Sequence, residues 1–375
     1  MLRSKTKYRP DISIYTNRLA GGGAERIIVT LLHEFVSRNL KVDLVLNQSS
    51  GYFISQLPPE VRLIDLDVLL PLREAIPKLI KYLREERPKA MLTTMHPYIE
   101  AALIAKKLSF TSTRLIIREA NTLSLNAPKT QDKARWSPFL AKFLYPWADE
   151  IIAISEGVAE DLVKVAQISN KRIQVIYNPA ITPNLKRMAQ ISLDHPWFSH
   201  GEPPVILGVG RLEPQKDFAT LIKAFALVSL KQPCRLVLLG QGSQHENLQE
   251  LAIELGVDNK IAMLGFQENP YQYMARAAVF VLPSAWEGFG NVVAEALALG
   301  TPVVCTNCQS GPAEIINQGK YGWLVPVGDD RTMANAILEV LYTNERRTVD
   351  TEWLEQFTVD YAARRYLDLL IGSDR

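Results

Sequence analysis

Residues 283–316, PSAWEGFGNVVAEALALGTPVVCTNCQSGPAEII, decide how the rest of the chain is interpreted. An unbroken apolar run, residues 277–283, leads into this segment, and a second run, residues 300–306, lies inside it. Runs of this kind are typical of strands buried on both faces of a parallel sheet. Between them, residues 291–299 are predicted to form a short helix that Gly300 ends. The segment therefore predicts an open α/β sheet, whose ligand crevice lies at the carboxyl ends of the strands.

Two glutamates fall at this predicted crevice. Glu287 lies in the loop after the first strand, and Glu295 follows eight residues later, inside the helix. A loop carboxylate can accept hydrogen bonds from sugar hydroxyls, a second carboxylate can hold a ribose diol, and a helix N-terminus attracts phosphate. A nucleotide sugar needs all three, although the spacing alone fits a solvated loop residue and a helix-surface charge better.

Residues 284–316 resemble the E-x7-E region of the retaining glycosyltransferases with the GT-B fold, the large GT4-like (glycosyltransferase group 1) family. The resemblance implies an α/β fold of two Rossmann-like domains that face a cleft, with a C-terminal helix that crosses back to the first domain. It also implies that Glu287 contacts the donor sugar and that Glu295 contacts the ribose. Further donor contacts would come from Gly288, Phe289, Gly290 and Asn291.

A second loop supplies two cations. PVILGVGRLEPQKD, residues 204–217, runs from a predicted strand into a loop that carries Gly210, Arg211 and Lys216. Loop cations are usually solvated, but this stretch is similar to the family's G-R-L-x-x-x-K-D segment. The similarity implies that Arg211 and Lys216 bind the donor diphosphate and that Gly210 is a donor-binding residue. Cations placed there stabilise the leaving group without a divalent ion, so we expect neither a metal nor another cofactor.

Glycines mark the remaining donor positions. Gly21, Gly22 and Gly23 permit a tight turn and close approach to a ligand, and a purely structural turn is an equally good interpretation. The stretch GGGAER also resembles the family's first glycine-rich loop, which implies that Gly22 and Gly23 face the donor diphosphate. The resemblance adds four donor-binding residues near the ends of later strands: Gly240, Gly265, Phe266 and Gln267.

Two polar residues of the first half are candidate contacts to the sugar or the acceptor. His96 follows the predicted strand of residues 91–95, where a lone histidine is more often a capping or packing residue. Many family members carry another histidine after the next strand. This chain has IIREANT there, residues 116–122, with Glu119 near that position, as in the branch that reads SERN.

Length and charge divide the chain into parts. Its 375 residues suggest two domains, residues 1–185 and 204–357, joined by a linker and followed by a closing helix, residues 358–375. The net charge of +2 hides 28 basic against 19 acidic residues, a net charge of +9, in residues 1–195. An anionic partner or surface is therefore expected at the first domain. The sequence contains no recognisable nucleic-acid module, so nucleic acid is not expected as that partner. The predicted linker comprises residues 186–203.

A membrane surface is the anionic partner that we favour. Basic and aromatic residues interleave in KTQDKARWSPFLAKFLYPW, residues 129–147, a composition typical of segments that lie on a membrane. An ordinary helix that buries its aromatic face fits the pattern equally well. No apolar run approaches the ~18 residues of a bilayer span, residues 1–10 lack the apolar region of a secretory signal, and three cysteines fit a reducing compartment. We therefore expect a cytoplasmic protein that can lie peripherally on the inner face of the membrane.

The resemblance implies a retaining glycosyltransferase that moves a sugar from a nucleotide diphosphate sugar, UDP in preference to GDP, to an acceptor hydroxyl of a glycan or lipid-linked glycan. A sugar-nucleotide epimerase or phosphorylase with the same fold is an alternative, as is a non-catalytic subunit that binds a nucleotide sugar. A non-catalytic subunit would lose the charged residues of the crevice, whereas Arg211, Lys216, Glu287 and Glu295 are all present. In the predicted reaction Glu287 positions the sugar and is not a base.

Overall fold

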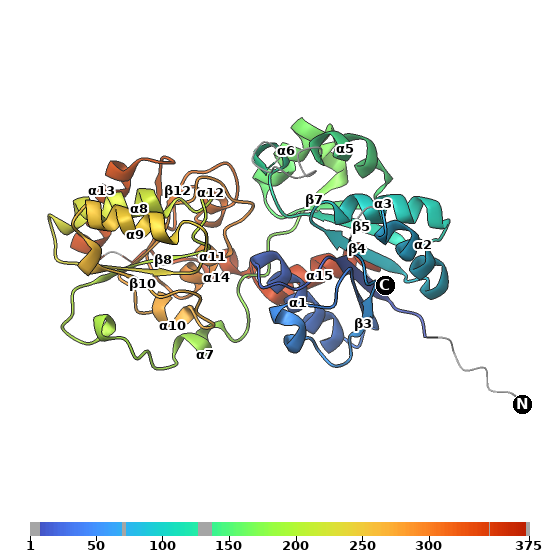
Figure 1. The fold of residues 1–375 in the computed structure, drawn as a ribbon, viewed down its shortest axis with the longest axis horizontal. Helices are drawn as coiled ribbons and strands as arrows, with labels where there is room; N and C mark the ends of the chain where they lie inside the picture. The colour runs from blue at the N-terminus through green and yellow to red at the C-terminus, as the bar shows by residue number, and fades with distance from the viewer. Residues whose placement is uncertain (1–7, 70–72, 127–136, 345, 373–375) are drawn as a thin grey trace, which may run out of the picture. The chain divides into compact units, whose positions relative to one another are not determined.

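The computed structural model describes residues 8–69, 73–126, 137–344 and 346–372. They form two compact units (Figure 1). The first comprises Met1–Pro179 and Val359–Arg375, and the second comprises Ala180–Thr358. Each unit is an α/β layer structure built on one parallel sheet, as the sequence predicted.

Among the described residues, the sheet of the first unit has seven parallel strands in the order β3-β2-β1-β4-β5-β6-β7. The strand order reverses between β1 and β4, and in open α/β sheets a ligand crevice is expected at the carboxyl ends of the two strands at such a reversal. The strands are β1 (Ile12–Thr16), β2 (Val42–Leu46), β3 (Arg62–Asp65), β4 (Ala90–Thr94), β5 (Arg114–Glu119), β6 (Glu150–Ala153) and β7 (Ile173–Val175).

One face of this sheet is covered by the first long helix and the last. Ile12 and Ile14 of β1 are fully buried against Leu31 of α1 and against Ala363 and Tyr366 of α15. Figure 1 shows α15, from the red end of the chain, beside α1 from the blue end. The helical segments are α1 (Gly23–Ser37), η1 (Tyr52–Gln56), α2 (Ala75–Glu86), α3 (Tyr98–Ser109), α4 (Leu123–Asn126), α5 (Ser137–Leu144), η3 (Tyr145–Trp147), α6 (Glu156–Ala166), η4 (Asn170–Arg172) and α15 (Val359–Leu370).

The second unit repeats this plan with a described sheet in the order β10-β9-β8-β11-β12-β13, all parallel. Its strand order reverses between β8 and β11. The strands are β8 (Val205–Val209), β9 (Arg235–Leu239), β10 (Ile261–Met263), β11 (Val279–Leu282), β12 (Val303–Thr306) and β13 (Trp323–Val325). The helical segments are α7 (Leu185–Ala189), η5 (Pro196–Phe198), α8 (Phe218–Ser229), α9 (His245–Glu254), η6 (Asp258–Lys260), α10 (Tyr271–Met274), α11 (Asn291–Ala298), α12 (Pro312–Ile315), α13 (Asp330–Thr343) and α14 (Thr351–Glu355).

The segment that we predicted to be a linker, residues 186–203, is part of the second unit. Most of α7 lies in this segment, and its backbone is held by the region around α10. Asn269 Nδ2 donates to Met188 O at 2.9 Å, and Arg276 Nη1 donates to Ala189 O at 3.0 Å. A helix of five residues leaves too few positions for a periodic pattern, so the sequence did not reveal it.

In the described part of the chain, no helix combines the length and apolar composition that a membrane crossing requires.

Candidate active site

Two loops meet at the point where the strand order of the second unit reverses. β8 leads into Gly210 and Arg211, and the loop ends at Asp217, whose side chain caps α8 by accepting the Thr220 backbone N–H at 3.4 Å. Asp217 also accepts the Thr220 hydroxyl at 2.7 Å. β11 leads into residues 283–290, after which α11 begins at Asn291. In a doubly wound sheet this is the position of the ligand crevice.

A buried ion pair joins the two loops. Lys216 Nζ donates to Glu287 Oε1, and the two side chains are only 13% and 7% exposed. Ser284 Oγ donates to the same carboxylate oxygen at 2.7 Å. The structure therefore brings together two of the charged residues that the sequence singled out, and it fixes the orientation of the Glu287 carboxylate.

Gln215 ties the same loops together, although the sequence did not single it out. Its amide nitrogen donates to Trp286 O at 3.1 Å, and its backbone carbonyl accepts the Ala285 N–H at 2.9 Å. Its side-chain oxygen accepts a hydrogen bond from Arg211 Nη2 at 3.0 Å. The exposed Arg211 guanidinium is thus anchored on the loop that carries Lys216.

Glu295 lies on α11, one element beyond Glu287. Its side chain is 2% exposed, and Tyr271 OH donates to Oε1 at 3.2 Å. Tyr271 belongs to α10, and no local pattern in the sequence links residues so far apart. The structure thus adds a buried phenol to the predicted ribose contact.

Three of the predicted donor-binding glycines lie together because their backbones touch. A Cβ atom on Gly240 would lie 1.9 Å from Gly210 O, and Gly240 N donates to Gly265 O at 2.8 Å. Gly240 also has a φ of 141°, which favours glycine. These contacts hold the ends of β8, β9 and β10 close to one another.

The two predicted donor-binding phenylalanines differ in exposure. Phe266 is 53% exposed just after Gly265, and Gln267 beside it donates to Leu264 O at 2.9 Å. Phe289 is 2% exposed, and its ring packs 5.8 Å from that of Phe357, so only its backbone can face a ligand. Gly288 and Gly290 are buried beside it, and Asn291 is partly buried at the start of α11.

The glycine-rich loop belongs to the first unit. Gly22 caps α1, its carbonyl accepts the Arg26 N–H at 3.1 Å, and Gly23 is the first residue of the helix. Both glycines follow β1 and therefore lie at the point where the strand order of the first unit reverses. They are in a different unit from Lys216 and Glu287.

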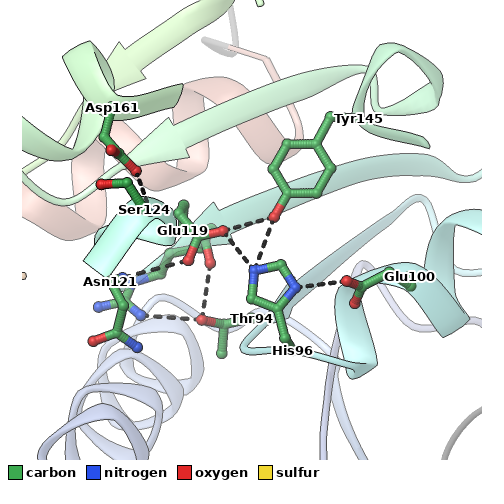
Figure 2. Close-up of polar contacts among 9 residues, drawn as sticks. Thr94, His96, Glu100, Glu119, Asn121, Ser124, Tyr145 and Asp161 are labelled. Carbon is green, nitrogen blue, oxygen red and sulfur yellow. Dashed lines mark hydrogen bonds and ion pairs between the residues drawn. The ribbon is translucent and has the colours of Figure 1, made fainter. Parts of the chain in front are cut away.

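His96 and Glu119 are in direct contact, in a cluster of four side chains (Figure 2). His96 Nδ1 is 2.7 Å from Glu100 Oε1, and His96 Nε2 is 2.9 Å from Glu119 Oε2. Tyr145 OH donates to the same Glu119 oxygen at 2.6 Å. The side chains of His96, Glu100 and Glu119 are 13%, 2% and 1% exposed, so Glu119 is turned into the protein and away from solvent.

The charges in this cluster stabilise one another. Burial lowers the pKa of His96, but Glu119 and Glu100 outweigh it and raise the pKa of His96 to about 10. Burial raises the pKa of Glu119, but His96 and the Tyr145 hydroxyl more than compensate, and this carboxyl's pKa lies below its ordinary value. His96 is therefore an imidazolium at neutral pH, and each ring N–H donates to a carboxylate.

Sequence reasoning missed Glu100 and Tyr145. Glu100 could have been found, because it lies four residues after His96, a spacing that brings two side chains together at the start of a helix. Tyr145 comes 49 residues after His96, beyond any local pattern.

In the described residues, no group of three or more His, Cys, Asp and Glu side chains converges to hold a metal ion. Cys305 and Cys308 are buried free thiols, and burial raises the pKa of Cys308 to about 11.

Comparison with known proteins gives two family matches that together span most of the chain. Residues 193–350 match the model described as glycosyl transferases group 1, and residues 21–182 match glycosyltransferase family 4. A relative from Campylobacter jejuni, N-acetylgalactosamine-N,N'-diacetylbacillosaminyl-diphospho-undecaprenol 4-alpha-N-acetylgalactosaminyltransferase, is 34% identical over 349 residues. The alignment covers 90% of this chain and 91% of the relative.

Solved structures share the fold. The lipopolysaccharide outer core galactosyltransferase WaaB superposes with a TM-score of 0.76 at 21% identity, over 97% of this chain and 99% of that one. Anabaena HepE in complex with UDP and glucose superposes with a TM-score of 0.78 at 20% identity, over 96% of this chain and 99% of that one. The predicted two-domain, Rossmann-like fold is confirmed. The chain therefore belongs to the group 1, GT4-like glycosyltransferases and is a hexosyltransferase-type enzyme.

Proposed function

We propose that the protein transfers a sugar from a UDP-sugar, with retention of the anomeric configuration and without a metal ion, to a hydroxyl of a lipid-linked glycan. The observation that carries this proposal is the contact between Lys216 and Glu287 where the strand order of the second unit reverses. It places a cation suited to a diphosphate beside a carboxylate suited to a sugar.

Each of the proposed donor-binding residues is assigned to one part of the nucleotide sugar. Arg211 and Lys216 bind the diphosphate, and Glu287 accepts hydrogen bonds from the sugar hydroxyls. Glu295 holds the ribose, with Tyr271 OH orienting its carboxylate. The exposed Phe266, shortly after the end of β10, is assigned to the nucleotide base.

The chemistry follows from these assignments. The bond between the anomeric carbon and the diphosphate oxygen breaks, and the acceptor oxygen bonds to the same face of that carbon. The acceptor proton passes to the departing phosphate oxygen, so no protein base is needed. Arg211 and Lys216 stabilise the negative charge that develops on the diphosphate, which is the main catalytic contribution.

Names of similar proteins support the choice of substrates. HepE was solved with UDP and glucose, which favours a uridine nucleotide. The Campylobacter transferase is named for a diphospho-undecaprenol acceptor, and WaaB is a lipopolysaccharide galactosyltransferase. Both names describe acceptor glycans that are carried by a lipid.

A surface on α5 and η3 supports a peripheral position on the inner face of the membrane. Phe139, Phe143 and Trp147 are 61%, 54% and 42% exposed, and Lys142 is exposed between them. Lys107 Nζ lies 5.7 Å from the Trp147 ring centroid. Exposed aromatic rings beside lysines suit the headgroup boundary of an anionic membrane. Residues 129–136 of the predicted membrane segment lie outside the described residues.

The test combines nucleotide binding with transfer. We expect UDP to raise the melting temperature more than GDP does, and a radiolabelled UDP-sugar to label a lipid-linked glycan acceptor in the presence of EDTA. Sugar-nucleotide interconversion without an acceptor would indicate an epimerase, and binding without turnover would indicate a non-catalytic subunit. A larger shift with GDP would overturn the choice of nucleotide.

A further inference from the structure

The cluster of His96, Glu100, Glu119 and Tyr145 occupies a place in the first unit where a ligand site is expected. β4 ends at Thr94, and the strand order reverses between β4 and β1. His96 lies in the loop after β4, directly at this reversal. The equivalent loops of the second unit carry Lys216 and Glu287, so the first unit has its own charged contact at the corresponding point.

Four different parts of the fold contribute to the cluster, as Figure 2 shows. His96 comes from the loop after β4, Glu100 from the first turn of α3, Glu119 from the end of β5, and Tyr145 from η3. The ring of Tyr145 is parallel to that of His96, with 6.3 Å between their centroids. The cluster therefore links β5, α3, η3 and the loop after β4 to one another.

The buried charges make the contacts within the cluster costly to break. Two carboxylates share one imidazolium, and all three side chains are largely removed from water. Removing one partner of a buried, hydrogen-bonded charge pair leaves the other uncompensated, which is far more costly than losing a surface ion pair. The groups that face His96 are Glu100 from α3, Glu119 from β5 and Tyr145 from η3.

The cluster also fixes two loops at the carboxyl edge of the sheet. Glu119 Oε1 accepts the Asn121 N–H at 3.4 Å, which holds the loop between β5 and α4. The contact between His96 and Glu100 holds the loop between β4 and α3. Tyr98, at the start of α3, packs edge-on against Tyr15 of β1, with ring centroids 6.3 Å apart. The Tyr98 ring, at the start of α3, thus follows directly on the loop that His96 anchors.

We propose that Glu100, Glu119 and Tyr145 are positioning residues that hold His96 as a fixed cation, and that the two loops held in this way shape the acceptor site of the first unit. This inference rests on the proposed function, because the acceptor is the second substrate of that reaction. His96 is then neither a general base nor a hydrogen-bond donor to the sugar, since both ring N–H groups already donate to carboxylates.

The members of the cluster should differ in importance. Glu119 uses both oxygens, one for His96 and Tyr145 and the other for Asn121. Glu100 uses Oε1 for His96, and its Oε2 has no hydrogen-bond partner among the described residues. Replacement of Glu119 should therefore disturb the loops more than replacement of Glu100.

The first experiment measures the protonation of His96 in the unmodified protein. The ring resonances are assigned by comparison with the spectrum of His96→Gln and are followed by NMR from about pH 6 to pH 9. We expect chemical shifts of an imidazolium with two protonated nitrogens throughout. Titration of this ring near its ordinary pKa of ~6.5 would overturn the inference without any reference to activity.

The second experiment separates acceptor from donor. In Glu119→Gln and in the milder Tyr145→Phe, we expect the acceptor KM to rise on the order of tenfold to a hundredfold, because a small displacement of a substrate-positioning loop is enough for such a loss. The affinity for UDP should stay within about twofold of the wild type. The matched control is Glu160→Gln, an exposed glutamate on α6, which should change neither quantity.

The outcomes distinguish this inference from the proposed function. A wild-type protein that binds no nucleotide would contradict the proposed function while leaving the NMR result for His96 intact. Equal losses of UDP affinity and acceptor affinity in Tyr145→Phe would show a merely structural cluster and overturn the positioning role. An acceptor KM unchanged in both variants would overturn it as well.

Discussion

Lys216 and Glu287 form an ion pair with each other, so the environment of each depends on the other. Each is largely buried, and each supplies the charge that offsets the other. A bound diphosphate would share Lys216 with this carboxylate, so that the sugar and phosphate contacts are coupled through one ammonium group. Substitution of either residue therefore has consequences for its partner as well as for the donor.

We predict that Lys216→Ala lowers kcat/KM by roughly a hundredfold or more, because it removes a charge-assisted contact that strengthens as the diphosphate leaves. Steady-state kinetics with saturating acceptor measures the loss. Lys223→Ala, which removes an exposed lysine of α8, is the matched control and should behave like the wild type. Strong inhibition of the wild type by EDTA, or near-normal turnover of Lys216→Ala, would contradict a metal-free mechanism.

Substitutions of the two predicted donor carboxylates should have different effects on turnover and on UDP affinity. Glu287→Gln should lower turnover and leave the affinity for free UDP close to normal, because we assign this residue to the sugar and not to the nucleotide. Glu295→Ala should weaken UDP binding itself, and Tyr271→Phe should weaken it to a smaller degree, since it removes one hydrogen bond to Glu295. Calorimetric titration with UDP checks this order. Similar affinities in Glu287→Gln and Glu295→Ala would mean that the roles are misassigned.

A third prediction concerns pH. The pKa of His96 is about 10 in the folded protein and ~6.5 in an unfolded chain. A raised pKa contributes stability that is complete below about pH 6.5 and is lost as the pH rises towards 10. The free energy of unfolding should therefore decline over this window, and His96→Gln should decline less steeply. Denaturant titrations at several pH values test this, with the exposed His200→Gln as control; equal slopes in all three proteins would refute it.

At the residue scale, the sequence singled out charged residues that lie together at the strand-order reversal of the second unit, but not the residues that hold them. Arg211, Lys216 and Glu287 follow the ends of strands, and that position is visible in the pattern of apolar runs. Gln215 and Tyr271 are recognisable only through contacts across 71 and 24 residues, which no local pattern encodes. The sequence also could not show that the Phe289 side chain turns into the core.

At the scale of single elements, α5 exposes large aromatic side chains to solvent. Its Phe139 and Phe143 rings contact each other, with centroids 5.0 Å apart, and both are more exposed than buried. Ala141 and Leu144, on the other face of the helix, are buried. The helix therefore packs on the first unit through small and aliphatic residues and presents aromatic ones outward.

We predict that this exposed face binds anionic vesicles. Binding should fall as salt rises, and it should weaken severalfold in Lys142→Glu, since each basic residue near an anionic surface contributes about 1 kcal/mol. The double variant Phe139→Ser and Phe143→Ser should weaken it further. Co-sedimentation measures binding, and Leu230→Ser, an exposed apolar site in the second unit, is the matched control. A wild-type protein indifferent to anionic vesicles would favour a soluble acceptor.

Elements with strong patterns were predictable, and short ones were not. The buried parallel strands β8, β11 and β12 stand out as apolar runs, and α11 stands out between a loop and Gly300. The segment that contains α7 was predicted to be a linker, because its prolines and polar residues hide a helix of five residues. Its place in the second unit depends on hydrogen bonds to Asn269 and Arg276, far along the chain.

At the scale of the whole molecule, α15 supplies part of the hydrophobic core of the first unit. Tyr366 is fully buried, and its hydroxyl accepts a hydrogen bond from the buried Arg118 Nε at 3.0 Å. Tyr366→Ala should lower the free energy of unfolding by roughly 3–5 kcal/mol, the usual cost of truncating a large buried aromatic residue. Asp368→Ala, an exposed position on the same helix, should have little effect. Calorimetry would show the change in the melting transition of the first unit, and an unchanged transition in Tyr366→Ala would contradict this role.

The position of α15 in the chain also has a consequence for biosynthesis. The 179 residues of the second unit, Ala180–Thr358, are translated after the main part of the first unit and before α15. At roughly 5–20 residues per second, the ribosome takes about ten to forty seconds to add them. During that interval the nascent chain exposes the apolar surface that α15 will later cover. The second unit can thus finish folding before the first unit is complete.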